Sequence, residues 1–127
     1  MNRAWNGDAT VLVVEDDPSF RLALCDAIRS RGFRVVEAVS AAECLDAIDR
    51  PRPCVVVLDL GLPDMDGIAL IRRLKDDPER NHIPIVAMTA AGDESTEPRV
   101  LSAGGAAFVR KPPNLVDLLG LLQNLCA

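Results

Sequence analysis

Aromatic residues, histidine and long apolar runs are all scarce in this chain of 127 residues. Aromatic residues make up 3% of the sequence and there is one histidine, so we expect a core built of Val, Leu, Ile and Ala. No apolar run approaches the roughly 18 residues of a membrane-spanning helix. Polar residues such as Arg3 and Asp8 interrupt the N-terminal segment, which therefore lacks the apolar stretch of a signal peptide.

Basic charge is also limited. Lys and Arg number 14 against 19 Asp and Glu, which gives a formal net charge of −5. No basic cluster occurs, and this argues against direct binding of nucleic acid. We expect a cytoplasmic protein with neither membrane nor nucleic-acid contact.

The cysteines show no paired spacing. The four of them are far apart, and they match neither a zinc site nor a disulfide framework. We therefore interpret all four as reduced thiols, most of them packed as small hydrophobic side chains. They are Cys25, Cys44, Cys54 and Cys126.

What the chain does contain is a series of short valine-rich runs. The run Val55–Asp59 has four apolar residues and ends on a carboxylate. Such a run is typical of a parallel strand buried on both faces. Similar patterns predict strands over residues 10–14, 34–38, 54–58, 85–88 and 106–109.

Helical patterns alternate with these strands. Pro18 suits a first helical turn, and Phe20, Leu24 and Ile28 form one inward stripe. Ser40 with Glu43 forms a capping box for a second helix. The helices are expected over residues 18–31, from 40 to before Pro51, over 67–75 and 97–103, and from 114 to the terminus.

This order predicts one α/β domain. Five strands alternating with five helices indicate a doubly wound, five-stranded parallel sheet, (βα)5, with helices on both faces. By analogy with flavodoxin-like folds we expect the strand order 2-1-3-4-5. Residues 1–9 are interpreted as a lead-in and residues 10–127 as the domain.

Polar residues follow four of the strands and are expected at one edge of the sheet. Glu15 and Asp16 follow the first strand, Asp59 ends the third, Thr89 follows the fourth and Lys111 the fifth. Clustered carboxylates repel one another unless a cation joins them, and oxygen ligands suit Mg²⁺. Each residue alone could be an acidic helix start, a turn residue or a solvated lysine. Together they predict a metal site beside Asp59, a plausible phosphoryl acceptor.

With these residues in this order, the chain resembles the receiver domain of bacterial two-component response regulators. The resemblance runs from Thr10 to the end and rests on four motifs. They are Val-Leu-Val-Val-Glu-Asp-Asp-Pro, Val-Val-Val-Leu-Asp-Leu-Gly-Leu-Pro-Asp-Met-Asp-Gly, Val-Ala-Met-Thr-Ala and Phe-Val-Arg-Lys-Pro.

The resemblance implies a phosphorylation-driven switch. Asp59 would accept a phosphoryl group from a sensor histidine kinase or a histidine phosphotransfer protein. Lys111 would contact that group, and the Lys111–Pro112 bond would be cis. Thr89 and Phe108 would form the switch pair. Mg²⁺, or Mn²⁺, would be bound by Asp16, Asp59, the backbone carbonyl of Gly61 and, through a water, Glu15.

Apolar residues on two helices are candidates for partner contacts. Leu22 lies off the inward stripe of the first helix, which faces the kinase in this family. The last helix has six leucines and Val116 over an arc of about 220°, more than one buried face requires. We predict a dimer or partner interface there, with a deeper core contact as the alternative. Its candidate residues are Leu118, Leu121 and Leu125.

Two other functions compete with this interpretation. One is a receiver-like module that binds or dimerises without phosphorylation, although none of the expected site residues is missing. The other is a phosphatase of the haloacid-dehalogenase type, which needs a second Asp two residues after the first. Gly61 stands there. We expect that the domain is not an enzyme for other substrates and catalyses only its own phosphorylation and dephosphorylation. It would act either as a stand-alone regulator or as one domain of a longer regulator or hybrid kinase.

Overall fold

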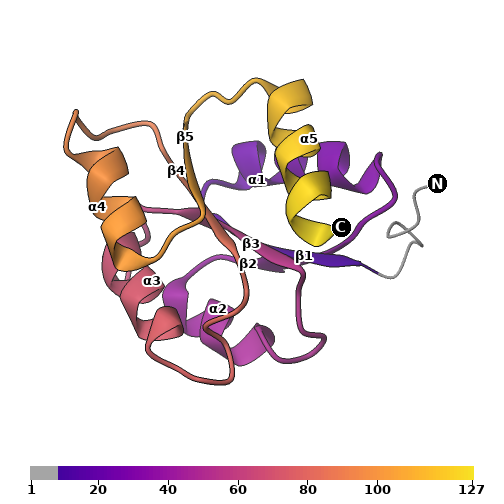
Figure 1. The fold of residues 1–127 in the computed structure, drawn as a ribbon. Coiled ribbons are helices and arrows are strands. Elements are labelled where there is room, and N and C mark those ends of the chain that lie inside the picture. The colour runs from indigo at the N-terminus through magenta and orange to yellow at the C-terminus, as the bar shows by residue number, and fades with distance from the viewer. Residues whose placement is uncertain (1–8) are drawn as a thin grey trace.

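The computed structural model describes residues 9–127 and shows one five-stranded sheet. All neighbouring strands are parallel, and their order is β2-β1-β3-β4-β5. The predicted α/β fold is therefore confirmed, as Figure 1 shows. The strands are β1 (Thr10–Val14), β2 (Arg34–Ala38), β3 (Val55–Asp59), β4 (Ile85–Thr89) and β5 (Ala107–Arg110). The helices are α1 (Pro18–Arg29), α2 (Ala41–Ala47), α3 (Gly67–Lys75), α4 (Thr96–Ala103) and α5 (Leu115–Cys126).

The helices cover the sheet in two layers. The layer of α1 and α5 packs on Val11, Val13, Val57 and neighbouring strand residues. The layer of α2, α3 and α4 packs on the alternate side chains of the same strands, such as Leu12 and Leu58. Figure 1 shows α1 and α5 together on one side and the other three helices on the opposite side. Every residue of β1, β3 and β4 is buried, which explains their uninterrupted apolar sequences.

Most predicted boundaries agree with the structure within one or two residues. β3 begins at Val55 instead of Cys54, and α1 ends at Arg29. The lead-in predicted over residues 1–9 lies outside the described residues except for Ala9, so that division stays a prediction. The Lys111–Pro112 bond is cis as predicted, and so is Arg50–Pro51.

Side-chain caps fix the start of α2. Ser40 Oγ accepts from the Glu43 amide at 3.1 Å, while Glu43 itself accepts from the Val39 amide at 3.0 Å. Asp64, in the loop after β3, accepts from the amides of Ala41 at 2.9 Å and Ala42 at 3.0 Å. These bonds satisfy amides that a helix start leaves without intrahelical partners. They also tie the loop after Asp59 to α2.

The cysteine prediction was wrong for two of the four residues. Cys54 and Cys126 form a disulfide, with their Cα atoms 5.1 Å apart. Their separation of 72 residues gives no local signal of pairing. They meet because the end of α5 packs back beside the start of β3. Cys25 and Cys44 are free and buried, as predicted.

The partner surface predicted on α5 needs one correction. Leu118 is 2% exposed and belongs to the core, so it is not part of any surface. Leu121 and Leu125 are partly buried and pack against the same core. Burial of several leucines follows from a helix lying closely against the sheet, which accounts for much of the wide apolar arc. The exposed apolar residues of α5 are instead Leu115 and Val116.

Within residues 9–127, no helix has both the length and the apolar character needed to cross a membrane.

Candidate functional site

Three carboxylates meet at the carboxyl edge of the sheet. Glu15, Asp16 and Asp59 each offer an oxygen, and these oxygens lie within 4.8 Å of one another. We call them the acid cluster. Glu15 and Asp59 are buried and Asp16 is exposed. The parallel pairing of Val14 with Leu58 brings the ends of β1 and β3 side by side, so the predicted convergence of these residues is confirmed.

Lys111 is far from the acid cluster in the sequence but lies against it in the structure. Its Nζ donates to Glu15 Oε1 at 2.6 Å and lies 3.5 Å from Asp59 Oδ2. The backbone places it there, because the Lys111 amide donates to the carbonyl of Thr89 at 3.0 Å, extending the pairing of β5 with β4. The lysine side chain is 14% exposed. Charge-assisted contacts of this kind are strong where water is largely excluded.

Burial and charge oppose each other in this group. Burial raises the pKa of Glu15, and the charge of Asp59 raises it further, against the lowering effect of the bonds from Lys111 and the Asp17 amide. For Lys111, burial pulls the pKa down, but Glu15 and Asp59 outweigh it and the pKa is raised. The lysine therefore keeps its positive charge, which is the form that can interact with an anion.

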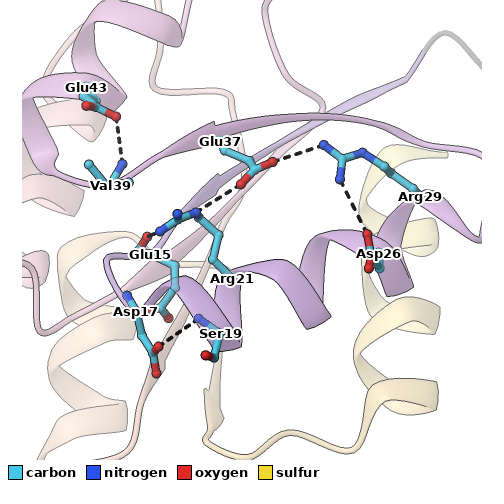
Figure 2. A network of polar contacts seen from close by, with 9 residues as sticks. All are labelled: Glu15, Asp17, Ser19, Arg21, Asp26, Arg29, Glu37, Val39 and Glu43. Carbon is cyan, nitrogen blue, oxygen red and sulfur yellow. Dashed lines mark hydrogen bonds and ion pairs between the residues drawn. The ribbon is translucent and has the colours of Figure 1, made fainter.

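A polar network behind the acid cluster holds Glu15 in place. Arg21 Nη1 donates to the backbone carbonyl of Glu15 at 2.9 Å, and Arg21 Nε donates to Glu37 Oε1 at 3.0 Å. Arg29 also pairs with Glu37, as Figure 2 shows. The Asp17 amide donates to Glu15 Oε2 at 3.0 Å. The network thereby connects α1 and β2 to the backbone and side chain of Glu15.

The loop after Asp59 is closed tightly onto the site. The Gly61 amide donates to Asp59 Oδ1 at 3.1 Å, and Gly61 forms an isolated antiparallel bridge with Asp66. A Cβ on Gly67 would lie 2.5 Å from the Cα of Leu60. Glycine is therefore required at position 67 for the backbone to turn back on itself, and this fixes where Gly61 lies.

Thr89 and Phe108 lie on neighbouring strands. Thr89 is 8% exposed, and its Oγ1 accepts from the Ala91 amide at 3.1 Å. Phe108 pairs in register with Ala87 and packs partly buried against the core under α4. The guanidinium of Arg110 lies 5.5 Å from the centre of the Phe108 ring. The structure thus places the two predicted switch residues on adjacent strands, Thr89 at the end of β4 and Phe108 within β5.

Two contributors were not identified from the sequence. The Phe20 ring, interpreted only as part of the inward stripe of α1, has Lys111 Nζ 4.5 Å from its centre. Asp64, which lies within the second motif and was given no role from the sequence, anchors the loop to α2. Their positions depend on which helix starts face the carboxyl edge, so the fold had to be known before their contacts could be inferred.

The model of the response regulator receiver domain family matches residues 11–123. This chain belongs to that family.

Its relatives share the domain across almost its full length. The polar-differentiation response regulator DivK of Brucella anthropi is 32% identical over 115 residues, covering 91% of this chain and 94% of DivK. The receiver domain of a signal transduction histidine kinase from Syntrophus aciditrophicus has a TM-score of 0.85 at 29% identity, covering 93% and 89% of the two chains. A CheY-like receiver protein from Methanospirillum hungatei JF-1 has a TM-score of 0.86 at 25% identity, covering 94% of each chain.

Proposed function

We propose that this receiver domain accepts a phosphoryl group on Asp59 in a Mg²⁺-dependent reaction and signals by a change of conformation. The observation that carries the proposal is the acid cluster with Lys111 beside it. Glu15, Asp16 and Asp59 supply oxygen donors within 4.8 Å, and Lys111 bridges Glu15 and Asp59. Membership of the receiver family supports the same chemistry.

The donor set fits a hard divalent cation. Asp16 and Asp59 would bind Mg²⁺ directly, with the carbonyl of Gly61, and Glu15 would act through a water. Oxygen-only donors with an exposed side at Asp16 suit an ion that keeps several waters. Mn²⁺ would be accepted by the same donors. When bound, the ion would neutralise charge that develops on the transferring phosphoryl group.

The residues of the chain would perform the transfer as follows. An Asp59 carboxylate oxygen attacks the phosphorus of the donor, forming a new oxygen–phosphorus bond. The bond between phosphorus and the donor's leaving atom breaks, and its electron pair leaves with the donor. Lys111, held positive beside Asp59, moves from Glu15 to the phosphoryl oxygens and stabilises their charge.

Thr89 and Phe108 would then carry the change away from the site. The Thr89 hydroxyl moves to the phosphoryl group, and the Phe108 ring turns inward into the space that Thr89 leaves. Partly buried Phe108 lies against the core under α4, so this motion alters the surface there. A homodimer or downstream protein would read the change near α5, in the region of Leu121 and Leu125. Exposed Leu22 on α1 is the candidate contact for a histidine kinase or phosphotransfer protein in the cytoplasm.

Intact-mass measurement tests the proposal directly. The protein is incubated with acetyl phosphate and Mg²⁺, beside Asp59→Asn and beside a sample treated with a chelator. We expect one added phosphoryl group in the wild type only, and only with the metal. Phosphorylation that persists in Asp59→Asn would show that another residue is the acceptor. No adduct, together with no binding of beryllofluoride, would favour a module that binds partners without phosphorylation.

A further inference from the structure

The ammonium group of Lys111 has three neighbours of two different kinds. Two are carboxylates, at 2.6 Å for Glu15 Oε1 and 3.5 Å for Asp59 Oδ2. The third is the face of the Phe20 ring, whose centre lies 4.5 Å from Nζ. An ammonium within about 6 Å of a ring centre is attracted by the negative face of the ring. The Phe20 ring is thus an uncharged contact of the Lys111 ammonium, beside the two carboxylates.

Phe20 reaches this position from the first turn of α1. Asp17 caps that helix and Pro18 opens it, directly after the acidic end of β1. The helix start therefore faces the acid cluster, and the partly buried ring lies between the helical core layer and Lys111. An aliphatic residue would fill the same core space. Only an aromatic ring also presents a face that attracts the ammonium.

We propose that Phe20 is a positioning residue for Lys111, holding its ammonium beside Asp59 while the charges of the site change. This inference rests on the proposed phosphoryl transfer. During that reaction both carboxylate neighbours change their partners. Asp59 is an expected ligand of the cation and acquires the phosphoryl group, and Glu15 is expected to contact the cation through a water. The ring undergoes neither change. It therefore gives the lysine a fixed support as Nζ moves from Glu15 to the phosphoryl oxygens.

The first test compares substitutions that keep or remove the ring. Phe20→Leu retains an apolar side chain, and Phe20→Tyr retains the aromatic face. Phe33→Leu is the matched control, since Phe33 is a buried phenylalanine that precedes β2 at the opposite edge of the sheet. At saturating acetyl phosphate and Mg²⁺, Phe20→Leu should be phosphorylated about three- to tenfold more slowly. Phe20→Tyr and Phe33→Leu should keep nearly the wild-type rate under conditions where all variants are folded.

A double-mutant cycle shows whether Phe20 acts through Lys111. Phe20→Leu is measured again in the background of Lys111→Met. If Phe20 only positions the lysine, its substitution has no further effect on the slow rate of that background. An equal slowing in both backgrounds would assign Phe20 a general structural role and overturn the inference. So would a Phe20→Leu variant as fast as the wild type.

A second measurement does not depend on phosphorylation. The ring current of Phe20 should shift the NMR signals of the Lys111 side-chain methylene protons nearest Nζ. The shift should persist in Phe20→Tyr and disappear in Phe20→Leu, with the signals identified by their absence in Lys111→Met. Absence of the shift in the wild type would refute the contact itself. A shifted lysine in a wild type that takes no phosphoryl group would refute the proposed function, and the positioning role with it.

Discussion

Breaking the Cys54–Cys126 disulfide should destabilise the domain strongly. The bond joins the residue before β3 to the last turn of α5 and closes a loop across 72 residues of sequence. A cross-link of this kind restricts the unfolded chain, so its loss makes the unfolded state more favourable. Reduction in solution or replacement of both cysteines by serine removes the restriction.

The length of the loop gives the magnitude. For a loop of 72 residues, the chain-entropy relation gives about 4 kcal/mol at 25 °C. This is a large share of the roughly 5–15 kcal/mol that separates the folded and unfolded states of a typical domain. The corresponding fall in the thermal midpoint is on the order of 10–20 °C for a domain of this size.

The assay combines thermal unfolding with thiol counting. Unfolding is followed by circular dichroism with and without a thiol reductant, and the Cys54→Ser/Cys126→Ser double variant serves as control. The wild type should lose stability on reduction, and the double variant should not respond. Burial raises the pKa of Cys25 to about 11 and of Cys44 to about 12, so neither thiol should react while the protein is folded.

Two results would refute this reasoning. The first is a count of four reactive thiols, instead of two, in protein denatured without reductant. The bond would then be absent. The second is a wild type whose thermal midpoint is unchanged by reductant although thiol counting confirms the reduction. In that case the packing of α5 on the sheet would hold the two ends together without the covalent bond.

Four further substitutions test contacts of the site and the packing of α5. Gly67→Ala should cost about 1–3 kcal/mol in urea unfolding, since its Cβ would lie 2.5 Å from the Cα of Leu60. Gly120→Ala, in open space on α5, should instead gain about 0.5–1 kcal/mol. The bonds from the Ala41 and Ala42 amides lower the pKa of Asp64, so its stabilisation is complete above its unfolded pKa of 3.8 and is lost as pH falls through the lower folded value. Asp64→Ala should therefore lower the thermal midpoint at pH 7 and have less effect below pH 3.8. Lys111→Met removes a cation 2.6 Å from Glu15, and calorimetry should show Mg²⁺ binding tightened by about tenfold.

The sheet could be predicted almost completely from the sequence. Fully buried strands such as β1, β3 and β4 require unbroken apolar residues, and the polar residues that follow mark their ends. The acid cluster followed from the same pattern, because parallel strands bring their carboxyl ends together. The boundaries of α4 were accurate to one residue, although its sequence signal is weak.

The remaining features depend on distances that the sequence does not contain. The pairing of Cys54 with Cys126 results from how far α5 extends along the sheet, and no local spacing encodes it. The burial of Leu118 depends on how closely that helix approaches its neighbours. The contact of Phe20 with Lys111 joins two ends of the chain that become adjacent only after the sheet has formed.

The charges around Asp59 also differ between the two proposed states of the domain. Three carboxylates and one ammonium leave two negative charges uncompensated, which a single divalent ion would cancel. A phosphoryl group replaces the single charge of Asp59 with about two at neutral pH. The loaded site would then hold one negative charge more than its cations balance. Thr89 Oγ1 already accepts from Ala91, so its own proton is available to donate toward that excess charge. The proposed movement of Thr89 would thus be a consequence of charge balance, and it should weaken in any variant that adds a positive group beside Asp59.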